Sequence, residues 1–136
     1  MTLFVLDASI SVSWCFEDET NPTADRALAA LDSGAAMVPL VWAAEVGNAL
    51  MRGERRGRIT PDQIVQSLGA IASLEIVTDD DHVTGRLTDL LHLARTHRLS
   101  LYDAIYLDLA VREHLALATV DAALARAAQA VGVPLI

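Results

Sequence analysis

The chain has 136 residues, a hydrophobic fraction of 53% and a formal net charge of −8. This length suits one domain with a single sizeable core, and this composition excludes an intrinsically disordered protein. The single cysteine excludes an internal disulfide, and no apolar run in the sequence reaches the length of a membrane span. We therefore expect a single domain of residues 1–136 in the cytoplasm, without a signal peptide and without membrane contact.

Short apolar runs alternate with longer segments of helical periodicity along the chain. The expected strands are 3–6, 36–40, 75–78, 116–120 and 133–136. The expected helices are 8–16, 22–31, 41–56, 60–73, 80–97, 100–114 and 122–131. Because the strands are uniformly apolar and alternate with helices, the pattern predicts a three-layer α/β/α fold with a central, mostly parallel sheet.

Four carboxylates interrupt apolar stretches that are far apart in the sequence. They are Asp7, Glu45, Asp103 and Asp121. A buried carboxylate without a partner is costly, so each of these acids needs a basic neighbour or a cation. The chain contains no lysine, and no arginine lies within two residues of any of the four. A divalent metal is therefore a natural candidate for their common partner.

Each acid also has a simpler explanation. Asp7, Asp103 and Asp121 stand at or near the starts of expected helices, where carboxylates often act as caps. Glu45 is expected in mid-helix, where no cap is needed, and its best alternative partner is a distant arginine. Asp108 shares a helix with Asp103, and the pattern alone does not exclude it as a ligand. Taken together, the four acids favour a metal site at the carboxyl ends of the strands.

Oxygen ligands indicate a hard cation, Mg²⁺ or Mn²⁺, and the histidines show no zinc-binding spacing. Such an ion activates water and stabilises charge on a phosphodiester during in-line displacement. Ser9 and Thr119 lie two residues from Asp7 and Asp121, so they are candidates for orienting ligands or the attacking water. Local backbone capping is an equally good explanation for both hydroxyls.

The arginines are clustered despite the negative net charge. Arg52 and Arg55 belong to a group of four arginines within residues 52–58, directly after Glu45. We interpret Arg52 and Arg55 as candidate phosphate-binding residues, with a solvated helix face as the alternative.

Four short motifs occur in a characteristic order along the chain. They are D-A-S at 7–9, W-A-A-E-V-G-N-A-L at 42–50, L-S-L-Y-D-A at 99–104 and T-V-D at 119–121. In this order and spacing the chain resembles the PIN-domain ribonucleases, and more narrowly the VapC-type toxins of bacterial toxin–antitoxin pairs. The resemblance spans nearly the whole chain.

This resemblance implies an endoribonuclease that depends on Mg²⁺ or Mn²⁺. It implies metal ligation by Asp7 and Asp103, with Glu45 and Asp121 completing the pocket, and Ser9 and Asn48 also fit the family pattern. It further implies a homodimer and inhibition by a cognate antitoxin that covers the site.

Other classes of protein fit less well. An aspartyl-phosphate enzyme of the haloacid-dehalogenase type and a receiver domain both rely on a lysine, which this chain lacks. No glycine-rich phosphate loop is present. A catalytically inactive PIN-like module that binds RNA or protein remains the main alternative, although such a scaffold has no need of four unpaired acids.

Overall fold

The computed structural model describes residues 2–80 and 83–136 of the chain. The strands are β1 (Thr2–Leu6), β2 (Gly34–Val38), β3 (Ile76–Thr78) and β4 (Ala116–Ala118). The helices are α1 (Ala8–Cys15), α2 (Pro22–Ala30), α3 (Val41–Arg55), α4 (Pro61–Ala72), α5 (Leu87–His97), α6 (Leu101–Glu113) and α7 (Ala122–Ala130), with a 3₁₀ turn, η1 (Val83–Arg86), before α5. None of the described helices is long and apolar enough to cross a membrane.

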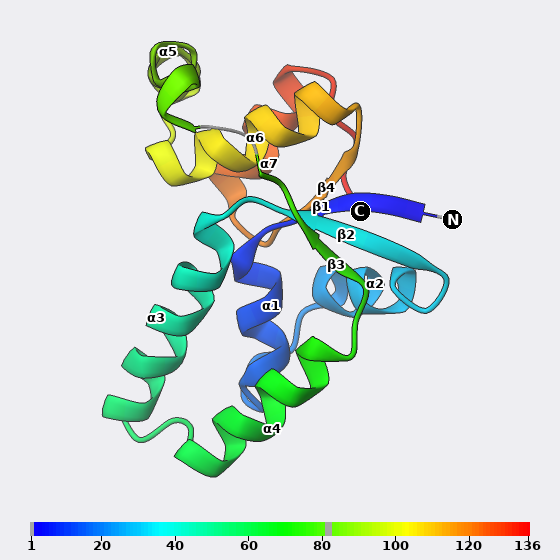
Figure 1. The fold of residues 1–136 in the computed structure, drawn as a ribbon, viewed down its shortest axis with the longest axis vertical. Helices are drawn as coiled ribbons and strands as arrows, with labels where there is room; N and C mark the ends of the chain where they lie inside the picture. The colour runs from blue at the N-terminus through cyan, green and yellow to red at the C-terminus, as the bar shows by residue number, and fades with distance from the viewer. Residues whose placement is uncertain (1, 81–82) are drawn as a thin grey trace.

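The four strands form one parallel sheet in the order β3-β2-β1-β4. The chain runs from β1 outward to β3 and then returns past β1 to β4. Because crossovers between parallel strands are right-handed, this reversal places the later helices on the opposite face of the sheet. Figure 1 shows α6 and α7 on one face and α1 and α2 on the other. The predicted three-layer fold with a parallel sheet is therefore confirmed.

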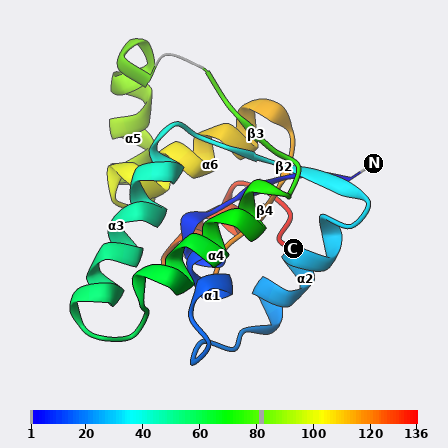
Figure 2. The same ribbon diagram turned by 60° about the horizontal axis from the view of Figure 1, so that its bottom comes forward.

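Two helices extend away from the sheet. α3 and α4 flank α1 and pack against it, and both project beyond the layer that covers the sheet (Figures 1 and 2). α5 lies at the opposite periphery and packs mainly against α6.

β1 is buried on both faces. Phe4 and Leu6 belong to a cluster with α2, whereas Val5 points into a second cluster with α6 and α7. All three side chains have no exposed surface. This is why the strand reads as a continuous apolar run in the sequence and not as an alternating one.

The predicted starts of two helices are confirmed. The Asn21 side chain accepts hydrogen bonds from the first turn of α2, and Pro22 occupies its first position. Thr60 and Gln63 form a reciprocal capping box at the start of α4.

The strand expected at 36–40 is displaced by two residues and spans Gly34–Val38. Its pairing with β1 begins at Gly34 opposite Thr2. It ends before Pro39, because proline has no N–H to donate to a neighbouring strand.

Two other expected elements were wrong in extent. The helix expected at 80–97 is interrupted: residues 83–86 form η1, which contains Gly85, and the α-helix begins only at Leu87. Residues 81 and 82 lie outside the described part of the chain. The strand expected at 133–136 is reduced to a single bridge between Leu117 and Leu135, since Pro134 cannot donate to the ladder.

Candidate active site

The candidate site begins where two neighbouring strands end. Asp7 follows β1 directly, and Asp121 lies three residues after β4, which pairs with β1. The Asp7 N–H donates to the carbonyl of Ala118 over 3.0 Å, which extends the pairing of the two strands by one step. β1 and β4 stand where the order of strands reverses, and ligands bind at this position in open parallel sheets.

Asp7 is the most buried of the four acids, with 4% of its surface exposed. Its side chain makes no capping hydrogen bond to α1. Instead, its Oδ2 accepts hydrogen bonds from the hydroxyls of Ser9 at 2.5 Å and Thr119 at 2.7 Å. Burial raises the pKa of Asp7, and these two hydroxyls only partly offset the effect.

Ser9 and Thr119 also connect the two strand ends. The Ser9 hydroxyl accepts from the N–H of Val120 at 3.2 Å, and the Thr119 hydroxyl accepts from the N–H of Asp121 at 3.0 Å. Each hydroxyl therefore accepts from backbone after β4 and donates to Asp7. Only the Thr119 bond is the local backbone contact that the sequence suggested, because Ser9 accepts from backbone that is distant in sequence.

Glu45 reaches the same region from α3. Its partner is not an arginine: Oε1 accepts a hydrogen bond of 2.8 Å from the hydroxyl of Tyr106 in α6. Burial raises the pKa of Glu45, and the negative charges of Asp7 and Asp103 raise it further. Burial and the neighbouring Glu45 also raise the pKa of the Tyr106 hydroxyl, which therefore stays protonated and remains a donor.

Asp103 occupies the first turn of α6. Its backbone N–H donates to the Ser100 hydroxyl, which caps the helix. Burial, together with the charges of Asp121 and Asp7, raises the pKa of Asp103 to about 6. The negative charges repel one another because carboxylates from separate elements share one region with little cationic charge nearby.

Asp121 is the most exposed of the four acids, and it caps a helix. Its Oδ1 accepts from the N–H of Leu124 at 2.8 Å, at the start of α7. The capping explanation is therefore correct for Asp121. The capping hydrogen bond uses only Oδ1, and the second carboxylate oxygen, Oδ2, takes no part in it.

One open cleft of about 560 Å³ brings these residues together. All four acids line it, as do Ser9 and Arg52, whereas Thr119 lies behind Asp7 and Arg55 is not part of the lining. The structure adds other lining residues, including Asn48 and Tyr102. Asn48 and Arg52 follow Glu45 at helical spacings of three and seven, which is the signal that places them on the same face of α3.

Asp108 lies in a different network. It accepts hydrogen bonds from the guanidinium groups of Arg86 and Arg112, and Arg112 also donates to Asp79. This network fastens η1 and the end of β3 to α6. Asp108 does not line the cleft.

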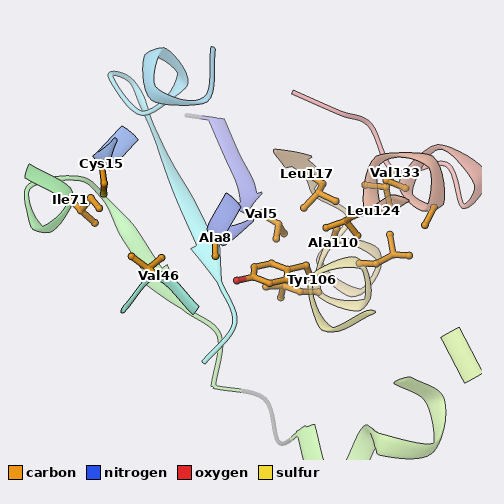
Figure 3. Close-up of a cluster of buried hydrophobic side chains, with 14 of the residues drawn as sticks. Val5, Ala8, Cys15, Val46, Ile71, Tyr106, Ala110, Leu117, Leu124 and Val133 are labelled. Atoms are coloured by element: carbon orange, nitrogen blue, oxygen red, sulfur yellow. The ribbon is translucent and has the colours of Figure 1, made fainter. Parts of the chain in front are cut away.

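Tyr106 is the functional candidate that the sequence did not reveal. Its only local signal is a hydroxyl on the apolar face of α6, and such a group needs a hydrogen-bond partner when it is buried. Figure 3 shows its ring within the apolar cluster and its oxygen directed toward Ala8 and Val46.

The donor set of the cleft fits a hard divalent cation. Within residues 2–80 and 83–136, none of the four acids forms an ion pair, so none is neutralised by an arginine. In the same residues, no three acidic, histidine or cysteine side chains form a ready-made ligand cluster. Mg²⁺ does not require one, because it keeps several waters and binds through one or two carboxylates.

The PIN-domain family model matches residues 4–130, and the chain therefore belongs to the PIN-domain family. Domains of this family are generally nucleases and typically use divalent metals.

Among solved structures, the chain is similar to PAE2754 from Pyrobaculum aerophilum. The TM-score is 0.71 at 21% sequence identity, over 93% of this chain and 84% of that chain. At this identity the likeness concerns the fold alone. A search of curated proteins found no significant match.

Proposed function

We propose that the protein, as one PIN domain of residues 1–136, is a metal-dependent endoribonuclease that hydrolyses phosphodiester bonds of RNA. The observation that carries the proposal is the convergence of four acids from four elements on one cleft without an arginine partner. Burial and mutual repulsion raise the pKa values of Asp7, Glu45 and Asp103. Such an arrangement is unfavourable by itself and becomes favourable when a cation binds.

Asp7 and Asp103 would hold Mg²⁺, with Mn²⁺ as an alternative, and Glu45 and Asp121 would complete the pocket through bound water. When bound, the ion supplies Lewis acidity to the phosphate and lowers the pKa of a coordinated water. Ser9 and Thr119 keep the Asp7 carboxylate in one orientation through their hydrogen bonds to Oδ2.

The reaction adds water across one ester bond. The water oxygen bonds to phosphorus, one phosphorus–oxygen ester bond breaks, and the leaving oxygen takes up a proton. The attacking water must lose a proton. We assign Glu45, which lines the cleft, as the side chain that accepts this proton. A carboxylate with a raised pKa is a better proton acceptor than an ordinary one.

Arg52 and Arg55 would bind the RNA backbone. Arg52 lines the cleft on the same face of α3 as Glu45, seven residues further along the helix, and Arg55 follows about one turn later at an exposed position. This local positive charge offsets the net charge of −8 where a phosphate must approach. Arg58 is committed elsewhere, because it pairs with Asp18 and Glu19.

Cleavage of labelled single-stranded RNA tests the proposal directly. With Mg²⁺ or Mn²⁺, the wild-type protein should produce discrete fragments, and Asp7→Asn should reduce the rate by at least about 100-fold. Asp62→Asn is the matched control, since Asp62 is exposed on α4, outside the cleft. Equal cleavage by wild type and Asp7→Asn would show that the assigned site is wrong. Binding of RNA without any metal-dependent cleavage would favour an inactive PIN-like module.

The toxin role is the narrower part of the proposal. The order of motifs around Asp7, Glu45, Asp103 and Asp121 resembles VapC-type toxins, so we propose a homodimer that acts in the cytoplasm and is inhibited by a cognate antitoxin. The acidic cleft attracts positive charge, which an antitoxin would supply. Expression of the chain alone should arrest growth, and co-expression with the neighbouring small gene product should restore it. Harmless expression of active nuclease would contradict the toxin role.

A further inference from the structure

Tyr106 joins the core of the protein to the candidate site. Its side chain has no exposed surface, and its ring packs in the cluster that contains Val5 and Leu107. Its hydroxyl is directed toward Ala8 of α1 and Val46 of α3, as Figure 3 shows. The ring is therefore held on all sides by apolar neighbours, and only the hydroxyl is free to serve another residue.

That residue is Glu45. The Tyr106 hydroxyl lies 2.8 Å from Glu45 Oε1, across 61 residues of sequence and between two different helices. Glu45 lines the cleft, whereas Tyr106 does not. One carboxylate oxygen is thus occupied from the core side, and the other is left for the cleft.

Glu45 needs such a contact because its neighbours repel it. Asp7 and Asp103 both act on it as like charges. The Glu45 side chain is long, flexible and partly exposed. Without a hydrogen bond, its carboxylate would rotate toward solvent and away from the other acids. Within residues 2–80 and 83–136, the Glu45 carboxylate accepts a single side-chain hydrogen bond, and Tyr106 donates it.

We propose that Tyr106 is a positioning residue that holds Glu45 in the cleft with one oxygen facing the bound ion and the substrate. The inference rests on the proposed metal-dependent function of the same site. Tyr106 does not line the cleft, so its effect on the ion and on the RNA would pass through Glu45.

Tyr106→Phe removes the hydroxyl and keeps the ring. Because Glu45 is partly exposed, its freed oxygen can bind water, and the variant should remain folded. We expect RNA cleavage at saturating Mg²⁺ to fall about tenfold, and the dissociation constant for Mn²⁺, measured by titration calorimetry without RNA, to rise about three- to tenfold.

A double-mutant cycle separates positioning from general damage. In a Glu45→Ala background, Tyr106→Phe should change cleavage and Mn²⁺ binding by less than about twofold, since the group through which it acts is gone. Glu45→Asp withdraws the carboxylate from the hydroxyl and should show a loss similar to that of Tyr106→Phe. The double variant Glu45→Asp/Tyr106→Phe should lose little more cleavage activity or Mn²⁺ affinity than either single variant.

Ser11→Ala is the matched control. The Ser11 hydroxyl accepts a hydrogen bond of 3.0 Å from the indole of Trp42, so it also fastens α3, one turn before Glu45 and from the side of α1. Ser11 is fully buried and does not line the cleft. The variant should lose stability but bind Mn²⁺ as the wild type does.

Two outcomes would overturn the inference. The first is that Tyr106→Phe binds Mn²⁺ and cleaves RNA as the wild type does. The second is that Tyr106→Phe reduces Mn²⁺ binding and cleavage by the same factor in the wild-type and in the Glu45→Ala background. A wild-type protein that cuts no RNA with either metal would instead refute the proposed function, while the calorimetric cycle would still decide whether Tyr106 acts through Glu45.

Discussion

Asp103 carries an electrostatic cost that can be measured in the absence of any ligand. Burial and the charges of Asp121 and Asp7 raise the pKa of Asp103 from 3.8 to about 6. The folded state therefore binds a proton more tightly than the unfolded state does. The free energy of unfolding falls as the pH rises through this window, and the cost is complete above the folded pKa.

Asp103→Asn should remove this cost. Without metal, we expect the variant to be more stable than the wild type by about 1 kcal/mol near neutral pH, after allowance for solvent screening at a partly exposed site. The difference should shrink toward zero below pH 3.8, where the carboxyl is protonated in both states. Urea unfolding in EDTA at several pH values measures it. A difference that does not change with pH would mean that Asp103 is not destabilised by its neighbours.

At the scale of elements, α3 depends on a close contact with the end of α1. A Cβ at Gly53 would lie 2.5 Å from two ring carbons of Phe16. The ring cannot easily move, because it is buried and the guanidinium of Arg58 lies 4.3 Å from its centroid on another side. The glycine therefore allows α3 to approach the end of α1 closely at Phe16.

Gly53→Ala should destabilise the protein by about 1–3 kcal/mol, because the added methyl group forces Phe16 or α3 to shift. Gly47→Ala in the same helix is the control, since nothing lies within 4 Å of its added Cβ. It should be neutral or stabilise by up to about 1 kcal/mol through higher helix propensity. Chemical denaturation of both variants tests the pair, and equal stabilities would show that the contact with Phe16 is not restrictive.

At the scale of the whole molecule, the order of strands brings the acids together. The reversal at β1 places the segments after β1 and β4 side by side, and α3 and α6 close over them from the two layers. Each acid comes from a different element, so an ion bound by several of them would link parts of the fold that are distant in sequence.

Mg²⁺ should therefore stabilise the folded protein. By mass action, a concentration of 100 times the dissociation constant adds about 2.7 kcal/mol to the free energy of unfolding. We expect the midpoint of thermal unfolding to rise with Mg²⁺ in the wild type and to stay nearly constant in Asp7→Asn. Sodium chloride at matched ionic strength controls for screening. An equal rise in both proteins would place the ion outside the assigned site.

Local patterns in the sequence determined much of this protein. The apolar runs predicted the parallel sheet, and the helices expected to start at residues 22 and 122 begin at those residues in the structure. The positions of Asp7 and Asp121 after strands predicted that they would meet. These inferences succeed because caps, strand burial and strand direction depend on neighbours in the chain.

Only the tertiary structure decided which side chains become partners. It paired Glu45 with Tyr106 and not with an arginine, and it placed Asp108 between Arg86 and Arg112, outside the cleft. Such outcomes depend on contacts between residues far apart in sequence and on the burial that those contacts create, and neither is encoded in a local pattern.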